Sequence, residues 1–220
     1  MLKNKKLLFL SLILFVISIA LNFPFPHKYP YGESVASILN IPIQMENGLH
    51  IVGITSLLFL ITSLFFLSKS FKKHKGRFIL LGIVCALFLP HFLADTYQKT
   101  FATGIYAISY EVETSECSFD MISDNTMQAI CEFSFINNNS WDNVSFDINF
   151  YETYLFEEDV NMLSLLGINA PYNVAIKAKE NKHVKIETMI DISDIKNHVD
   201  SGTASHVNII IESGEKMRKL

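Results

Sequence analysis

Three long apolar stretches, each almost free of charge, occupy most of the first hundred residues. Leu7–Phe23 contains no charged residue, and Leu49–Ser68 and Phe78–Tyr97 are 20 residues each. A helix rises about 1.5 Å per residue, so 20 residues reach the roughly 30 Å thickness of a bilayer core. The stretch 57–66 is apolar on every face, whereas a helix at the surface of a soluble domain has a polar side. The pattern therefore predicts three transmembrane helices, over 7–23, 49–68 and 78–97.

The distribution of charge predicts how these helices are oriented. Residues 1–100 carry 10 Lys/Arg and 3 Asp/Glu, whereas residues 101–220 carry 8 and 19. Basic residues precede the first span and fill the short loop 69–77, and such segments stay in the cytoplasm. The loop 24–48 has one Lys and two Glu, and we expect it outside. The sequence thus predicts a multi-pass protein of the cell membrane with a cytoplasmic N-terminus and an acidic extracytoplasmic domain over 101–220.

Two alternatives concern the basic segments. The lysine-rich start, the apolar stretch and the residues Ser18-Ile19-Ala20 are also typical of a signal peptide cleaved after Ala20. The apolar run continues to Phe23, which favours an uncleaved anchor. The loop 69–77 is too short to hold a folded nucleic-acid reader, so we expect it to orient the chain and attract anionic lipid, with no nucleic acid as partner.

Beyond Tyr97 the apolar residues recur at every second position. Six segments alternate in this way, and 115–122 is a weaker seventh: 106–112, 129–135, 144–150, 172–178, 184–192 and 207–211. One buried and one wet face per strand is typical of an antiparallel sheet. We expect the turns 137–143 and 180–183 to join consecutive strands as hairpins. About seven strands in 110 residues predict an immunoglobulin-like β-sandwich following a membrane α domain.

The stretch from Cys131 to Glu152, CEFSFINNNSWDNVSFDINFYE, resembles the strand, Asn/Ser turn and strand of FxLyD-type and related immunoglobulin-like domains of bacterial envelope proteins. The glycine expected soon after Tyr151 is missing. The Lys-, Asn- and Ile-rich composition agrees with a bacterial source. The resemblance implies an interaction or accessory domain without catalytic residues.

Three cysteines divide between the two parts of the chain. Cys117 and Cys131 lie in the predicted outer domain, 14 positions apart around a predicted hairpin, and a disulfide between them would close a loop worth about 3 kcal/mol. Two separately buried thiols are the alternative. Cys85 lies within the third span, where it serves as a small apolar side chain.

The spans also contain ionisable residues near their outer ends. His91 and Asp95 are four residues apart on one helix face, and His50 opens the second span at the same level. Such residues default to functional hypotheses, here a proton path or a polar cluster, although an interfacial polar pair explains them as well. The acidic run 157–159 fits a helix N-terminus better than a calcium loop, and we expect no metal site.

No nucleotide, nucleophile-elbow or paired-cysteine motif occurs, so we expect no catalytic residues, no cofactor and no enzyme activity. The leading hypothesis is an accessory or sensor protein of the cell envelope. It would contact a protein partner, or itself, through strand edges and Trp141 of the outer domain. Trp141 could instead cover one end of the sandwich. Alternative functions are a subunit of a small transporter or membrane enzyme that uses His50, His91 and Asp95, and an immunity or inhibitor protein.

Overall fold

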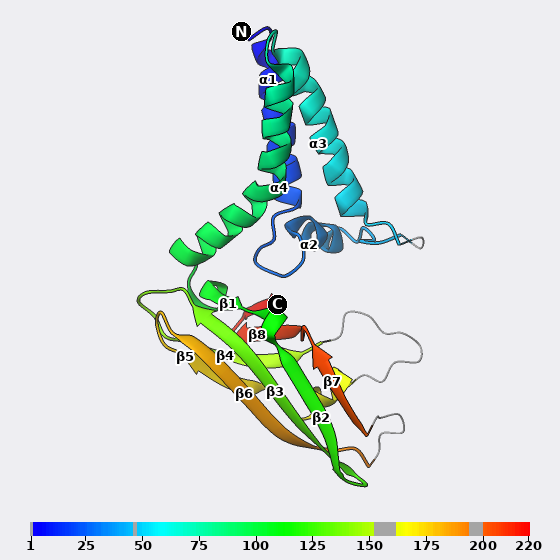
Figure 1. Ribbon diagram of the computed structural model, residues 1–220, viewed down its shortest axis with the longest axis vertical. Coiled ribbons are helices and arrows are strands. Elements are labelled where there is room, and N and C mark those ends of the chain that lie inside the picture. Colours follow the sequence, from blue (N-terminus) through cyan, green and yellow to red (C-terminus); the bar gives the residue numbers. More distant parts are fainter. Residues whose placement is uncertain (1, 46–47, 152–161, 194–199) are drawn as a thin grey trace. The chain divides into compact units, whose positions relative to one another are not determined.

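The computed structural model describes residues 2–45, 48–151, 162–193 and 200–220 of the 220-residue chain (Figure 1). The chain divides into two compact units, Met1–Thr96 and Tyr97–Leu220. The first is helical and the second is built mainly of antiparallel strands. The predicted order of helices followed by antiparallel sheet is therefore what the chain adopts.

Four helices form the first part of the chain: α1 (Lys5–Leu21), α2 (Tyr31–Ile38), α3 (Ile51–Ser70) and α4 (Lys75–Thr100). Among the described residues, two of them, α3 and α4, are long and apolar enough to cross a bilayer, not three. Helix α1 has 17 residues and spans about 26 Å, which is short of a full bilayer core. Its helix ends because Asn22 leaves the helical conformation and the prolines that follow cannot continue it.

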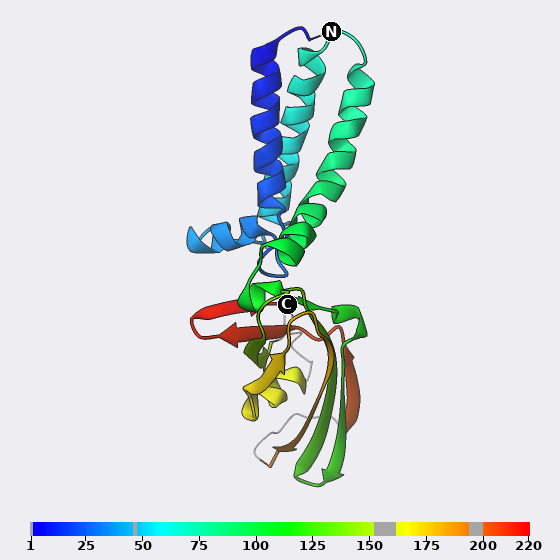
Figure 2. The ribbon, with the colours of Figure 1, turned by 90° about the vertical axis from the view of Figure 1, so that its left-hand side faces the viewer.

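Helices α1 and α3 run side by side, and α2 lies across them (Figure 2). Serines spaced seven residues apart line the contact between α1 and α3. Ser11 Oγ donates to the carbonyl of Ser63 (2.9 Å), and Ser63 Oγ donates back to the carbonyl of Ser11 (2.8 Å). One heptad away, Ser18 and Ser56 repeat the exchange at 3.0 and 3.2 Å. Small side chains with internal hydrogen bonds let two helix backbones approach closely.

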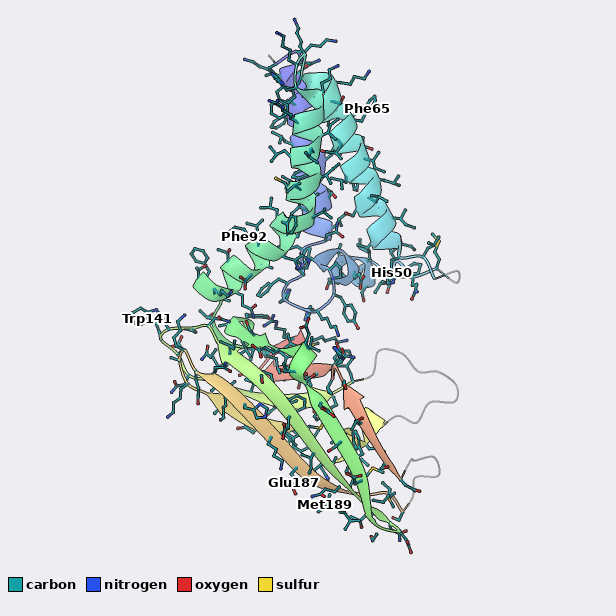
Figure 3. The ribbon with its side chains drawn as sticks, viewed as in Figure 1. His50, Phe65, Phe92, Trp141, Glu187 and Met189 are labelled. Carbon is teal, nitrogen blue, oxygen red and sulfur yellow. A yellow bond between two sulfur atoms is a disulfide. The ribbon has the colours of Figure 1, made fainter. Side chains whose placement is uncertain are left out.

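The polarity of this helical unit is inverted relative to a soluble protein. The buried residues of α1 are Ser11 and Ser18. Large apolar side chains on α1, α3 and α4 are exposed instead, including Phe9, Phe65 and Phe92, the last two labelled in Figure 3. The helices therefore have outward-facing surfaces that are mostly hydrocarbon.

Helix α4 packs on α3 near their shared loop. Phe71 and Phe78 stack with ring centroids 4.0 Å apart, and a Cβ added to Gly82 would lie 2.7 Å from Leu64 Cδ2. Further along, α4 is bent, and Pro90 lies inside it (Figure 1). Proline bends a helix because its ring clashes with the preceding turn and one backbone hydrogen bond is lost.

The described residues of the second unit form nine strands and four short helical segments. The 3₁₀ helices are η1 (Gly104–Ala107), η2 (Val112–Thr114) and η3 (Leu166–Ile168), and α5 is Met162–Leu165. The strands are β1 (Ile108–Tyr110), β2 (Glu116–Ser123), β3 (Thr126–Asn137), β4 (Val144–Phe150), β5 (Tyr172–Ile176), β6 (Asn181–Asp191), β7 (Ser201–Ser205), β8 (Ile209–Ser213) and β9 (Lys216–Lys219). Strands β7 and β9 are not predicted by the alternation of apolar and polar residues, because they are short and rich in small or charged residues.

The strands form two antiparallel sheets. In the first, β3 pairs with β6 along one edge and with β1 and β2 along the other, and β7 continues the sheet beyond β2. The second sheet has the order β5-β4-β8-β9. Residues from both sheets belong to one buried cluster, in which Phe119, Phe133, Phe135 and Phe146 are the largest side chains. The core lies where the alternating apolar residues were expected.

The hairpin predicted between Cys117 and Cys131 is confirmed by the pairing of β2 with β3, but the two predicted at 137–143 and 180–183 are wrong. The segment 137–143 joins β3 in the first sheet to β4 in the second, and the segment 177–180 likewise joins β5 to β6. Alternation identifies the buried face of a strand but carries no information on which strand pairs with it. Because both strands direct apolar side chains into the same core, a crossing between sheets satisfies the pattern as well as a hairpin does.

Polar groups fix the sheets to each other. Tyr110 OH donates to the carbonyl of Val207 (2.7 Å), and Ser115 Oγ accepts from the amide of the same residue (2.9 Å). Burial raises the pKa of Tyr110 to about 12. Arg218 is buried and its Nη1 donates to the carbonyls of Ile108 (2.6 Å) and Ile105 (3.3 Å). Burial lowers the pKa of the guanidinium to about 10, so it stays charged at neutral pH.

Candidate functional site

The helical unit contains a groove of about 600 Å³ between α1, α3 and α4. Its walls are mostly apolar, with a few polar groups: Ser18, Asn22, Lys28, Ser56 and His91. Asn22 Nδ2 donates to Ser56 Oγ and to the carbonyl of Ser18 (3.1 Å), so one side of the groove is already hydrogen-bonded. Such a groove can hold a slender apolar group with a polar end.

The three ionisable residues predicted as a cluster do not all share this groove. His91 lines it, whereas His50 and Asp95 are not among its lining residues. His50 instead lies at the start of α3, where its Nδ1 is 3.8 Å from Glu33 Oε1 on α2. Glu33 is largely buried, with 14% of its side chain exposed. Glu33 could not be predicted as the partner of His50, because the sequence does not show how the loop between α2 and α3 folds.

In the second unit, Cys117 and Cys131 form a disulfide. They occupy directly paired positions on the neighbouring strands β2 and β3, and both are fully buried. The bond therefore staples one hairpin within a single sheet. Cys85 is a free thiol on α4.

Trp141 lies on the connection from β3 to β4, with 90% of its surface exposed. Figure 3 shows its side chain pointing away from the sheets, at the end opposite Glu187 and Met189. It covers no part of the core, which removes the alternative of a structural lid. An indole this exposed is a candidate contact group.

Two buried asparagines hold the backbone that presents Trp141. Asn139 Oδ1 accepts from the amides of Trp141 (2.8 Å) and Asp142 (3.3 Å). Asn137 Oδ1 accepts from the amide of Asn139, and its Nδ2 donates to the carbonyls of Asp142 (3.0 Å) and Lys177 (3.1 Å). These asparagines satisfy the backbone groups of the turn, so the backbone at Trp141 is held by hydrogen bonds within the domain.

The outer face of the first sheet is acidic. Five carboxylates project from it; one, Asp191, lies at the far end of β6, and we call the other four the acidic face: Glu116, Asp120, Glu132 and Glu187. Glu116 and Glu132 are directly paired across β2 and β3. His183 Nε2 lies 3.4 Å from Glu132 Oε2, and Lys185 Nζ lies 3.6 Å from Glu187 Oε2. Like charges in directly opposite positions destabilise a sheet, so the pair Glu116 and Glu132 contributes nothing to the stability of the isolated domain.

No group of three or more His, Cys, Asp or Glu that could hold a metal ion occurs in the part of the chain that the structure describes. The acidic run 157–159 lies outside the described residues. No protein-family model matches this sequence, and no curated protein and no solved structure matches it either. Any account of function therefore rests on the geometry of the chain itself.

Proposed function

We propose that this chain is a multi-pass protein of the cell membrane whose β unit is displayed outside. In this proposal α1, α3 and α4 are the spans, and the N-terminus and the loop 69–77 are cytoplasmic. The β unit works by binding a protein partner, or a second copy, as an accessory or sensor element of the cell envelope. It catalyses no reaction.

The observation that carries the proposal is the inverted polarity of the helices. Serines fill the contact between α1 and α3, and large apolar side chains face outward. That arrangement costs free energy in water, at about 25 cal/mol for each Å² of apolar surface left exposed, and costs none in lipid. Although α1 is short, a bilayer thins locally and flanking lysines such as Lys5 reach the interface, which accommodates a mismatch of a few ångströms.

The ends of the helices support the proposed orientation. Residues 2–4 pair with the end of α3: the amide of Lys3 donates to the carbonyl of Ser70 (2.7 Å), and Leu2 bridges Phe71. The lysines before α1 and the basic loop 69–77 therefore lie together, as two segments on the same side of a membrane would. Basic residues concentrated at one end of a helical unit favour that end as cytoplasmic.

The strand order supports an immunoglobulin-like sandwich for the β unit. In such folds the first, second, fourth and fifth strands share one sheet, and the third, sixth and seventh share the other. With β1 and β7 left aside as additions to the first sheet, β2-β3-β6 and β4-β8-β9 follow that order, whereas the fourth strand, β5, lies beside β4 in the second sheet. The resemblance of residues 131–152 to FxLyD-type domains falls on β3, the crossing turn and β4.

Two features differ from antibody-type domains. Their disulfide joins the two sheets beside a buried Trp. Here Cys117 and Cys131 join neighbouring strands of one sheet, and Trp141 lies exposed in a turn. We therefore propose a topology related to that of antibody domains, stabilised by a disulfide within one sheet instead of between the two sheets.

The acidic face and the neighbouring edge of β6 are the surface we propose for partner binding. Residues 101–220 carry 8 Lys/Arg and 19 Asp/Glu, so long-range attraction favours a basic partner. Among the strands that the structure describes, β6 pairs only with β3, so its other edge offers backbone groups to an added strand, apart from the carbonyl of Met189, which accepts from Asn169 Nδ2 (2.8 Å).

Short-range crosslinking in native membranes, followed by extraction in mild detergent and mass spectrometry, tests the binding function. The proposal predicts a partner or second copy crosslinked to residues on β2, β3 or β6. Glu116→Lys should reduce its recovery, whereas Asp124→Lys, the same charge change in the turn outside the acidic face, should not. Crosslinks confined to the helices would contradict the proposal.

A second function is favoured by the groove lined by His91. If the helices carry a proton or a small amphiphile, as a subunit of a transporter or membrane enzyme, the polar groups of the groove are its path. His91→Ala would then abolish activity at normal expression. Asp95→Ala, one helical turn away and outside the groove, is the matched control.

A further inference from the structure

We propose that the end of the β unit that carries Trp141 rests in the lipid headgroup layer of the bilayer crossed by α4. The inference rests on the proposed membrane anchoring, because it takes α4 as a span. Beyond membrane anchoring, the inference assigns one surface of the β unit to lipid. The acidic face is then left for a protein partner.

The connection between α4 and the β unit is short. Helix α4 ends at Thr100, and η1 begins at Gly104. Four residues extend over at most about 14 Å. The amide of Asn138 donates to the carbonyl of Ala107 (3.0 Å), the last residue of η1, and Asn138 Nδ2 donates to Ser109 Oγ (2.8 Å). The turn with Trp141 is therefore fastened to the segment by which the chain leaves the membrane.

The exposed side chains near this end include large apolar and aromatic ones. The indole of Trp141 is 90% exposed, and Phe101 and Met217 are 73% and 40% exposed. Trp is enriched at the headgroup level because its ring is apolar and its N–H remains hydrogen-bonded there. Asn137 and Asn139 hold the turn rigidly, so insertion of the ring needs little ordering of the backbone.

The end that carries Trp141 contains both basic and acidic residues. Three lysines occupy turns and strands at this end, Lys177, Lys179 and Lys216, together with three carboxylates, Asp142, Glu180 and Glu215. Two of the carboxylates are engaged internally: Asp142 Oδ2 accepts from Asn139 Nδ2 (3.3 Å), and Glu180 Oε2 accepts from the amide of Lys177 (2.6 Å). The charges of these six residues cancel, and Lys182 near the start of β6 adds a positive charge, although residues 101–220 are acidic overall.

The opposite end of the sheets has a different character. Strand β3 has 12 residues and is about 40 Å long, and Thr126 at its far end pairs with Asp191. The described part of the turns there contains Asp124, Asp191 and Asp200 and no lysine. An anionic bilayer repels such a surface, so the Trp141 end is the one suited to lie on lipid.

Trp141 is the single tryptophan of the chain, so the unsubstituted protein reports on its own site. The experiment places the full chain in phosphatidylcholine liposomes, with and without a lipid carrying a nitroxide on its headgroup. The proposal predicts tryptophan emission at shorter wavelength than for an indole in water, and a loss of intensity with the nitroxide lipid.

The matched control moves the reporter to the other end of the sheets. In the variant Trp141→Phe/Met189→Trp, the new indole replaces a side chain that is 52% exposed on β6 (Figure 3). We expect water-like emission and little quenching by the nitroxide lipid. Equal emission and equal quenching for the native protein and the control would overturn the proposal. A short emission wavelength without lipid quenching would also overturn it, because the indole would then be covered by protein.

Flotation of the same liposomes separates this inference from the proposed function. If the chain does not float with lipid in a density gradient, membrane anchoring itself is wrong. If it floats and Trp141 remains in water, anchoring stands and the lipid contact of the domain is wrong.

Discussion

Ser11 on α1 and Ser63 on α3 each donate a hydrogen bond to the other's backbone carbonyl, at 2.9 and 2.8 Å. The exchange recurs one heptad away between Ser18 and Ser56. In water, two helices pack through their apolar side chains and leave their hydroxyl groups in contact with the solvent. In lipid, where apolar side chains gain little from contact with each other, small hydrogen-bonding residues are what hold helices together.

Replacement of Ser63 should weaken the pairing of α1 and α3. Ser63→Ala removes one hydrogen bond and should cost about 0.6–1.7 kcal/mol, and Ser63→Leu should cost more because the helices must separate. Thr62→Ala is the matched control, because the Thr62 hydroxyl donates to the carbonyl of Leu58 within its own helix (2.8 Å). Loss of helical circular dichroism with increasing dodecyl sulfate measures the effect. Equal unfolding of all three variants would contradict the role of the serines.

Removal of the disulfide should destabilise the β unit. The bond closes a loop of 14 residues, so Cys117→Ala/Cys131→Ala should lower the free energy of unfolding by roughly 3 kcal/mol. Cys85→Ala, which removes the free thiol of α4, should leave the β unit unchanged. Urea unfolding followed by near-ultraviolet circular dichroism provides the measurement. A double variant as stable as the native chain would show that the pairing of β2 with β3 needs no covalent support.

The stability of the β unit should fall above pH 10 because of Tyr110. Below that pH the phenol is neutral in both the folded and the unfolded chain, so it contributes no pH dependence. Between pH 10 and 12 the phenol ionises in the unfolded chain, at its ordinary pKa of 10, before it ionises in the folded chain, at about 12. Two pKa units correspond to at most about 2.7 kcal/mol, lost progressively over this interval.

Tyr110→Phe isolates this contribution. At neutral pH the variant should be less stable by about 1–2 kcal/mol, because the buried carbonyl of Val207 loses its donor. From pH 10 to 12 the difference between the native chain and the variant should shrink. A constant difference across that interval would mean that Tyr110 titrates alike in the folded and unfolded chain.

Much of the fold follows from local patterns. The uncharged runs locate α1, α3 and α4 to within about three residues, and alternation identifies the buried faces of β3, β4, β6 and β8. The assignment of strands to sheets was missed, because a period of two gives the buried face and not the neighbour. The start at Tyr106 was also wrong, because the polypeptide forms a 3₁₀ turn over Gly104–Ala107 before it pairs with β3.

The candidate site was predicted less completely. The disulfide of Cys117 and Cys131 and the exposure of Trp141 in a turn agree with the prediction, whereas the role of Trp141 as a contact group stays a proposal. The seven-residue spacing of Ser11 and Ser18, and of Ser56 and Ser63, is visible in the sequence. It indicates a row of small residues on each helix, where two helices could pack closely. The contact of His50 with Glu33 could not be predicted from the sequence, because it depends on how the loop before α3 turns back onto α2.

If the helices lie in a membrane and the β unit lies outside it, the two parts of the chain differ in their access to a reagent that cannot cross the membrane. Labelling of single cysteines in intact cells with a membrane-impermeant maleimide measures this difference, in a Cys85→Ala background in which the disulfide leaves no other thiol. We expect labelling of Asp124→Cys in intact cells, and labelling of Lys72→Cys only after the membrane is opened. Labelling of Lys72→Cys in intact cells, with Asp124→Cys protected until the membrane is opened, would contradict it.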